Sequence, residues 1–572
     1  MSQSPEASSL DLKRHLPYRD AIRVRLPGVR LYVGVMGIAL AAYVFAILFA
    51  PIRREWDTYL SFSHLYVWTA ELRSFNVLST WTPLDANGYG SPLPFFYHKL
   101  LNLTGAVLSI ASGDIVIGYR LTILAFSATL FAGIYMCARR LGGDRISSSA
   151  MATASVLAPY YMLKIYFGTV ADYSAAALIP VIVALVLDAR AGRFGMTKAA
   201  ALLAALLLLE LAHVLVAAMT FGVLLPVVVY LFISTRKAYP ALIATLLALV
   251  VFIGFFYVPF NFWSAEFSPA QAFIGGGVEN HLLGLSDLLS PSPLSSFGWP
   301  YFALMAGVAL YVFRARRVTD PRMHAAFVLG CLSLAIVFMT MKITRPFWQL
   351  GGPLEFIQFP FRLLSVATPL CLIAVAGLLG QLAPGTKRYV QFGILLFALA
   401  NAARLAGIGL HTRSPYWPAE LAMSHAELNR EVPPHQVIGP DAGGEYLPAA
   451  LHPILARTDV FKTPISTILP APRPFIEANG CRYPTMAHPL TLHLLQLPVT
   501  CAAGGTLRIN QFSTSMLESY ATNGTTTIRP RTDSLFIDFV LPPGQWTVTV
   551  RQRNWLELTA LAWRARLAPL WH

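Results

Sequence analysis

Long apolar runs follow one another from residue 31 to residue 410, and they limit the folds that are open to this chain. A helix that crosses a bilayer needs about 20 predominantly apolar residues, and a backbone inside lipid must satisfy its own hydrogen bonds, which favours helices. The runs are Leu31 to Ala50, Ile115 to Cys137, Ser147 to Leu163, Tyr173 to Leu187, Ala199 to Leu211, Val214 to Ile233, Ala241 to Tyr257, Ser296 to Phe313, Ala325 to Met341, Leu363 to Gly380 and Tyr389 to Leu410. We therefore predict a mainly α, polytopic membrane protein with about 11 transmembrane helices, one for each run.

The composition supports a lipid environment for these runs. The chain is 56% hydrophobic and 12% charged, whereas a soluble protein is usually about half apolar and about a quarter charged. The net charge of +15 does not indicate nucleic acid, because the basic residues lie mainly in short segments between the runs. No nucleic-acid partner is expected.

The basic residues also predict how the chain crosses the membrane. Short cytoplasmic loops carry an excess of Lys and Arg. With residues 1–30 as a cytoplasmic tail, every connection that should return to the cytoplasm is basic: Arg139, Arg140 and Arg145; Arg190, Arg193 and Lys198; Arg236 and Lys237; Arg314, Arg316 and Arg317; Lys387 and Arg388. Eleven crossings then place everything after Leu410 outside the cytoplasm.

The segment between the first two runs, residues 51–114, is predicted to be a large outer loop. It mixes polar residues with aromatic ones such as Trp56, Trp68 and Trp81, and its apolar stretch from Leu100 to Ile110 is too short to span easily. We expect helices that lie on the outer leaflet. The chain has no evident internal repeat, which argues against a transporter with matched halves.

The C-terminal part has a different pattern. The turn residues 542–544 precede an alternation of Trp546, Val548 and Val550, which predicts a β-rich domain over residues 411–553. Cys481 and Cys501 lie in it, and they are either joined by a disulfide or two free thiols. Residues 554–572 mix Trp and Leu with Arg, which is typical of an amphipathic helix on a membrane surface.

Asp57 is the first candidate for catalysis. It stands just past the outer end of the first run, beside Glu55 and Trp56, where an acid can meet both a water-soluble acceptor and a lipid-borne donor. A carboxylate in this position is a candidate general base. The alternative is a carboxylate that caps the following helix.

Four basic side chains are expected near the same membrane face. His213 follows Glu210 at a tight turn between two runs, where it could orient a phosphate or be satisfied by a carbonyl. Arg362 could hold a lipid phosphate through two parallel hydrogen bonds, or pair with Glu355. His98 and Lys99 could also bind phosphate, or mark the level of the lipid headgroups.

Several strings of residues carry a resemblance to a known family. They are Asp57 after the first run, residues 81–83 with 88–97, residues 354–362, which combine aromatic, Gln, Pro and Arg residues, and residues 444–448. In these strings the chain resembles bacterial membrane proteins that contain a 6-pyruvoyl-tetrahydropterin synthase-related membrane domain. That family is similar in architecture to the GT-C glycosyltransferases, which use an acid in the first outer loop and a sugar carried on a polyprenyl phosphate.

The resemblance implies roles for individual residues. Asp57 would be the loop-one acid and Asp172, before the fourth run, the second-loop acid, although Asp172 could instead cap its helix. A divalent cation such as Mg²⁺ or Mn²⁺ would suit these two acids and is the one cofactor suggested. The residues expected to hold the acceptor or support the site are Glu55, Tyr97, Glu355 and Gln358.

The sequence thus leads to a hypothesis of function. Residues 31–410 would form a GT-C-like domain in the bacterial inner membrane. It would transfer a sugar, with inversion, from polyprenyl phosphate to a cell-envelope glycan or glycolipid on the outer face, because nucleotide sugars are absent there. The alternative is a non-catalytic protein that transports or assembles a surface polysaccharide or glycolipid. Acceptor-dependent consumption of the lipid-linked sugar separates the two.

Overall fold

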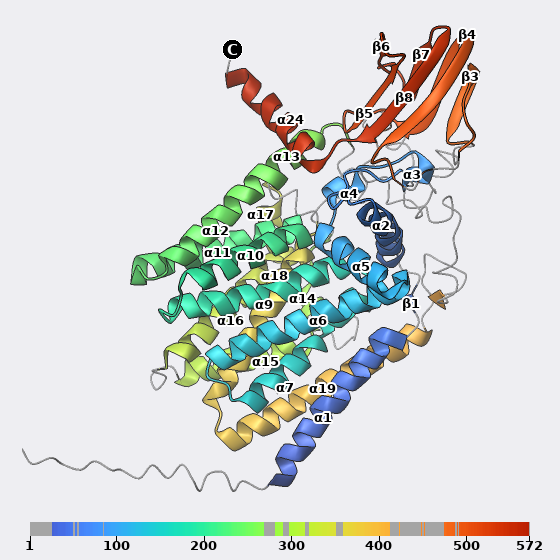
Figure 1. The fold of residues 1–572 in the computed structure, drawn as a ribbon. Helices are drawn as coiled ribbons and strands as arrows, with labels where there is room; N and C mark the ends of the chain where they lie inside the picture. The colour runs from blue at the N-terminus through green and yellow to red at the C-terminus, as the bar shows by residue number, and fades with distance from the viewer. Residues whose placement is uncertain are drawn as a thin grey trace, which may run out of the picture.

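The protein consists of a helical bundle and a C-terminal antiparallel sheet that lies beyond one end of the bundle (Figure 1). The structure is a computed structural model. It describes residues 26–49, 52–53, 56–83, 85–166, 168–267, 281–289, 297–314, 320–350, 359–411, 422–423, 448, 451, 474–486, 489 and 491–570. We call the end of the bundle near the sheet the sheet end.

The apolar runs form the helices of the bundle. These are α1 (Leu26–Phe49), α6 (Ile115–Arg140), α7 (Arg145–Val156), α8 (Pro159–Tyr166), α9 (Val170–Arg190), α10 (Met196–Ala212), α11 (Val214–Thr235), α12 (Tyr239–Val251), the π-helix η2 (Phe252–Tyr257), α13 (Val258–Trp263), α15 (Trp299–Arg314), α16 (Pro321–Met339), α18 (Leu364–Leu378) and α19 (Pro384–His411). Within the described ranges, seven helical segments are long and apolar enough to cross a membrane. The prediction of a mainly α, polytopic membrane protein is confirmed, and each predicted run coincides with helical structure, whereas the number of about 11 transmembrane helices stays a prediction.

One predicted run is not a single helix. The run Ser147 to Leu163 is divided between α7, which ends at Val156, and α8, which begins at Pro159. Proline has no backbone N–H to donate and disfavours the helical conformation of the residue before it. The break shortens both helices and sets the direction of α8 independently of α7.

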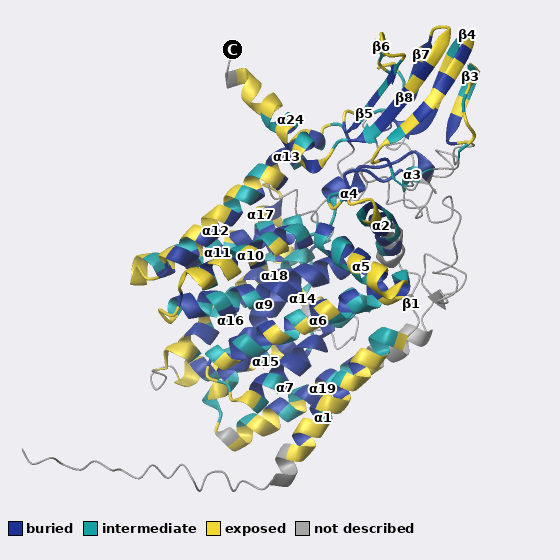
Figure 2. Ribbon diagram, in the orientation of Figure 1, coloured by how far each residue is buried: buried dark blue, intermediate teal, exposed yellow. Residues whose placement is uncertain are grey.

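Two helices form the centre of the bundle. Every residue of α18 is buried and most of α9 is buried, whereas α1 is largely exposed (Figure 2). Small residues allow α18 to approach its neighbour α16 closely: a Cβ atom on Gly377 would lie 2.5 Å from the Cβ of Ala326. Close approach through small residues is typical of helix packing in membranes.

The first predicted outer loop also folds into helices. They are α2 (Trp56–Arg73), α3 (Asp85–Gly88), α4 (Leu93–Phe96) and α5 (Lys99–Ser112). Helix α5 packs between α2 and α6, so the loop lies against the bundle. A two-residue strand before it, β1 (Ile52–Arg53), pairs with β2 (Ala422–Met423).

The C-terminal sheet has six strands, which are β3 (Ile476–Arg482), β4 (Leu495–Phe512), β5 (Leu517–Thr522), β6 (Thr527–Ile528), β7 (Phe536–Leu541) and β8 (Gly544–Gln552). The order is β3-β4-β8-β5-β6, and β7 pairs with the second half of β4. The predicted alternation is present from Gln545 to Val548, since Trp546 and Val548 are buried while Gln545 and Thr547 are exposed, and it ends where Thr549 and Val550 are both buried. A C-terminal sheet domain was predicted, and it is confirmed.

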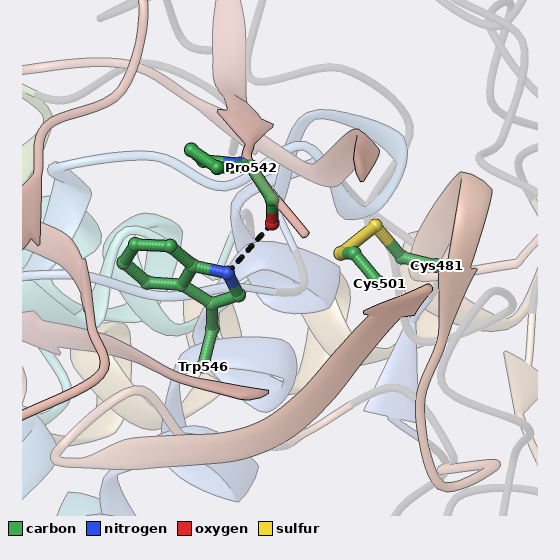
Figure 3. Close-up of a disulfide and its surroundings, with 4 residues drawn as sticks. All are labelled: Cys481, Cys501, Pro542 and Trp546. Atoms are coloured by element: carbon green, nitrogen blue, oxygen red, sulfur yellow. Dashed lines mark hydrogen bonds between the residues drawn. A yellow bond between two sulfur atoms is a disulfide. The ribbon is translucent and has the colours of Figure 1, made fainter. Parts of the chain in front are cut away.

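Cys481 and Cys501 are joined by a disulfide between the neighbouring strands β3 and β4 (Figure 3). Next to it, the indole N–H of Trp546 donates to the carbonyl of Pro542 at 3.0 Å, which fixes the β7–β8 turn. The described residues also contain three free cysteines, Cys137, Cys331 and Cys371, all of them in bundle helices.

The disulfide is expected to contribute to the stability of the sheet. Replacing both Cys481 and Cys501 with alanine should lower the free energy of unfolding by about 2 to 4 kcal/mol, because the bond closes a loop in the unfolded chain. Thermal unfolding of purified protein measures the change, and Cys331→Ala serves as the control. Two free thiols found by mass spectrometry of the non-reduced protein would contradict the pairing.

After the sheet, the chain ends in the helix α24 (Trp555–Leu567), which begins with a capping box formed by Asn554 and Glu557. Its inner face packs on the bundle: Trp263 Nε1 donates to the Leu558 carbonyl at 3.2 Å, and Trp563 Nε1 donates to the Gly254 carbonyl at 2.9 Å. Leu556 and Leu567 of α24 are exposed. Contact of α24 with a membrane surface stays a prediction.

Two buried glutamines connect the sheet to the first loop, and we call them the glutamine latch. Gln552 Oε1 accepts hydrogen bonds from the backbone N–H groups of Thr80 and Trp81, both at 2.9 Å, and Gln552 Nε2 donates to Glu71 at 2.8 Å. Gln511 accepts from the Trp81 indole at 3.0 Å. The segment after α2 is therefore held in place by strands that lie more than 400 positions further along the chain.

The latch requires close packing around it. Gln511 Nε2 also donates to the carbonyls of Pro83 and Gly88. At Gly90, φ is +87° and a Cβ atom would lie 2.4 Å from Gln511 Oε1, so only glycine fits there. Burial raises the pKa of Glu71 to about 7.

Candidate functional site

Five polar side chains from separate parts of the chain meet at the sheet end of the bundle. They are His98 at the start of α5, Lys164 on α8, Asp172 on α9, His213 between α10 and α11, and Arg362 on the short 3-10 helix η8 (Pro360–Leu363). We call them the Asp172 cluster. The cluster lies near the sheet because His98 directly precedes Lys99, and Lys99 contacts the helix that follows the sheet. The Lys99 ammonium lies 3.9 Å from the ring centroid of Trp555 on α24.

Asp172 lies at the centre of the cluster. Its carboxylate accepts a hydrogen bond from Lys164 Nζ through Oδ2, and Oδ1 lies 2.8 Å from His213 Nε2. Gly168, with φ of +74°, turns the chain between α8 and α9, and this turn brings Lys164 back to Asp172. The helix cap is Thr169, whereas Asp172 is the third residue of α9 and directs its carboxylate to side chains of two other elements.

His213 is held by the ends of two helices. It follows the last residue of α10 and precedes the first residue of α11, and its backbone N–H donates to the Leu209 carbonyl at 3.0 Å. Its ring is 5% exposed, and its Nε2 contacts the Asp172 carboxylate rather than a carbonyl. Nδ1 has no hydrogen-bond partner within the part of the chain that the structure describes.

His98 and Arg362 complete the cluster on its other sides. The His98 ring centroid lies 4.3 Å from that of His213 and 4.2 Å from that of Tyr97. The Arg362 guanidinium lies 4.7 Å from the ring centroid of Phe359. Tyr97 thus reaches the edge of the cluster through His98.

The electrostatics of the cluster favour an anion. Burial lowers the pKa of His98 well below its usual value, and the neighbouring His213 and Arg362 lower it further. Burial also lowers the pKa of His213, although the Asp172 carboxylate opposes this shift. With both imidazoles neutral, the two cations Lys164 and Arg362 outnumber the anion Asp172 among the five described members of the cluster.

Lys99 is placed differently from the other predicted phosphate ligands. Its Nζ donates to the carbonyls of Phe95, at 2.9 Å, and Tyr97, at 3.3 Å. Only 2% of the residue is exposed, and burial lowers the pKa of its amine well below the usual value. Lys99 therefore connects the first loop to Trp555, and we do not include it in the Asp172 cluster.

Several predicted residues are not placed by the structure. Glu55, Glu355 and Gln358 lie outside the described residues. The backbone of Asp57 forms the second residue of α2, but its side chain is not described. Its role as the loop-one acid stays a prediction.

Lys164 is a member of the cluster that was not among the predicted site residues. The signal was available, because Lys164 directly follows the apolar run Ser147 to Leu163 on the face predicted to be outside. Basic residues are less frequent on that face. A lysine there, eight positions before an acid at the start of the next helix, indicates a specific partner.

The suggested metal site includes Asp172, whose surroundings are described. Among the described residues, no group of three or more His, Cys, Asp or Glu side chains could hold a metal ion. Both oxygens of Asp172 already have side-chain partners, one of them an ammonium group. Because the side chain of Asp57 is not described, a divalent cation shared by Asp57 and Asp172 stays a prediction.

The structure can be compared with solved structures. It is similar to ArnT from Cupriavidus metallidurans bound to undecaprenyl phosphate, with a TM-score of 0.43 and 17% sequence identity over 68% of this chain and 66% of that chain. It is also similar to the same protein in the apo state, with a TM-score of 0.42 and 19% identity over the same shares. At this level the likeness carries no argument about activity.

The sequence comparisons are more specific. No curated protein matches the sequence significantly. Residues 89–405, more than half of the chain, match the model of a family described as "6-pyruvoyl-tetrahydropterin synthase related domain; membrane protein". The matched region includes every member of the Asp172 cluster. The chain therefore belongs to the family of membrane proteins with the 6-pyruvoyl-tetrahydropterin synthase related domain.

Proposed function

We propose that this protein is a membrane glycosyltransferase. It transfers a sugar from a polyprenyl-phosphate donor to a cell-envelope glycan or glycolipid on the outer side of the bacterial inner membrane. The observation that carries the proposal is the Asp172 cluster, a partly buried group of side chains at one end of a helical bundle, in which the described cations outnumber the described anion. A lipid-borne phosphate is an anion that arrives at this depth without leaving the membrane.

The cluster has the chemistry that this substrate needs. Lys164 and Arg362 attract the phosphate, and the planar guanidinium of Arg362 matches two phosphate oxygens. During transfer, negative charge grows on the departing phosphate, and cations fixed in place before the reaction stabilise that charge. Asp172 holds Lys164 in position for this role.

The direction of the chain in the membrane agrees with an outward-facing site. The cluster lies at the start of α9, and the end of the same helix carries Asp188, which pairs with Arg140 at 2.9 Å and Lys198 at 2.8 Å. The excess of basic residues at that far end is typical of the cytoplasmic side. The cluster then faces the periplasm, where a donor must be carried by lipid.

Transfer by purified protein tests the proposal. Full-length protein in nanodiscs is given a panel of polyprenyl-phosphate sugars and an extract of envelope glycolipids, and acceptor-dependent donor consumption is measured. Lys164→Met should slow consumption by about 10²- to 10³-fold, the usual loss when one preorganised donor to a developing anion is removed. The control is Lys237→Met, an exposed lysine between α11 and α12.

The outcomes separate the alternatives. Equal rates for Lys164→Met and Lys237→Met, at equal expression and thermal stability, would contradict the proposal that the cluster stabilises the departing phosphate. Donor binding by the wild type without any consumption would favour the non-catalytic alternative, a protein that transports or assembles a surface glycolipid.

A further inference from the structure

The contact between Asp172 and His213 fixes the hydrogen position on the His213 ring. A carboxylate accepts hydrogen bonds and cannot donate them, so Nε2, at 2.8 Å from Asp172 Oδ1, carries the hydrogen. In a neutral imidazole the other nitrogen is then a bare acceptor. That nitrogen, Nδ1, is buried and has no hydrogen-bond partner among the residues described.

A bare nitrogen lone pair is poorly suited to a site that binds an anion. Every oxygen of an ionised phosphodiester is an acceptor, so it cannot donate to Nδ1. If His213 takes up a proton, Nδ1 becomes a donor and the imidazolium adds a positive charge. Anion binding and protonation at this nitrogen therefore favour each other, and the coupling must be reciprocal.

Charged and titratable groups face His213 from each element that packs around it. They are His98 from α5, Lys164 from α8, Asp172 from α9 and Arg362 from η8, while Glu210 lies one turn earlier on α10. Without a bound anion, the positive charges of Arg362 and Lys164 disfavour protonation of His213. A bound anion offsets their charge, and Asp172 then stabilises the imidazolium directly.

His98 is the other imidazole in the cluster, but it lacks this support. Its ring contacts the rings of His213 and Tyr97 rather than a carboxylate. It also sits beside the buried Lys99, whose charge disfavours protonation. Of the two histidines, His213 is therefore the one equipped to carry a proton.

We propose that a phosphate anion binds at the Asp172 cluster together with one proton, and that His213 Nδ1 takes up this proton from solvent. The inference rests on the proposed function for the identity of the anion as the phosphodiester of a lipid-linked donor. It gives the site a pH-dependent affinity, with tighter binding as the pH falls. It also makes His213 a ligand-binding residue whose charge depends on whether the site is filled.

Calorimetry with a phosphodiester tests this inference without any transfer reaction. The probe is a polyprenyl methyl phosphodiester, whose charge is constant between pH 6 and pH 8, titrated into full-length protein in nanodiscs. Heats measured in two buffers of different ionisation enthalpy give the number of protons taken up. We expect uptake approaching one proton and an affinity that rises by up to about tenfold for each unit of pH decrease.

Two histidine variants give a matched comparison. His213→Gln retains an N–H that can donate to Asp172 but has no nitrogen that can be protonated, so proton uptake and the pH dependence of affinity should disappear. His98→Gln should retain both. Thermal unfolding checks that the variants fold. If a variant does not fold, the proton uptake measured for the wild type still tests the inference.

Each result has a defined meaning. Binding by the wild type without proton uptake, or unchanged uptake in His213→Gln, would overturn the inference and leave the proposed function intact. Absence of binding at every pH would instead overturn the phosphate site and the proposed function with it.

Discussion

Replacing Gln552 with leucine is expected to detach the first loop from the sheet and to destabilise the whole protein. The leucine fills similar space but leaves the backbone N–H groups of Thr80 and Trp81 without their acceptor. A buried donor without a partner costs about 1 to 3 kcal/mol, so two such donors should cost on the order of 2 to 6 kcal/mol. Thermal unfolding of purified protein measures the loss.

Hydrogen exchange gives a second, local measurement of the same effect. The amides of Thr80 and Trp81 should exchange faster in Gln552→Leu, and by a larger factor than amides in the middle of α18. The control is Gln545→Leu on the same strand, where the side chain is exposed. Unchanged exchange at Thr80 and Trp81 would show that the glutamine latch does not hold the loop.

The expected consequence extends to the Asp172 cluster. Trp555 follows the latch residue Gln552 by three positions, and its ring lies 4.2 Å from that of Phe95 and beneath Lys99. Phe95 and Lys99 flank Tyr97 and His98, which reach His213. The C-terminal sheet therefore acts as a support for one side of the cluster.

The helical part of this architecture could be predicted from the sequence because its cause is local. A run of about 20 apolar residues forms a helix in lipid because a helix satisfies all its backbone hydrogen bonds within the segment. Each predicted run coincides with helical structure. The exception has a local cause as well: Pro159 divides the run Ser147 to Leu163 into two helices. The turn at residues 542–544 and the alternation after it likewise indicated a strand.

The contacts between distant segments could not be predicted in this way. Gln552 and Gln511 lie in strands and have no pattern that distinguishes them from exposed glutamines, and their partners lie more than 400 positions earlier in the chain. Asp172, His213, His98 and Arg362 were each predicted as site residues, but their distances follow from helix packing. Lys164 resembles any other lysine beside an apolar run, and only the packing of α8 against α9 brings it to Asp172.

The loop-one acid is the prediction with the largest expected effect on activity. Asp57→Asn should reduce the rate of sugar transfer by about 10²- to 10⁴-fold, the usual contribution of a general base. The substitution keeps the shape of the side chain but removes its negative charge, so it can no longer accept the proton of the acceptor hydroxyl. Folding and donor binding should remain, because donor binding depends on the Asp172 cluster. Transfer from polyprenyl-phosphate sugar at equal expression measures the effect.

Asp114→Asn is the matched control because it changes an acid that caps a helix in the same loop. The Asp114 carboxylate accepts from the N–H of Ile117 at 2.9 Å at the start of α6, and asparagine caps a helix about as well as aspartate. This variant should therefore keep the wild-type rate. If Asp57→Asn also keeps it with donor binding unchanged, Asp57 has only the structural role that Asp114 has. The proton acceptor would then have to be sought among the other acids expected near the site, which are Glu55, Asp172 and Glu355.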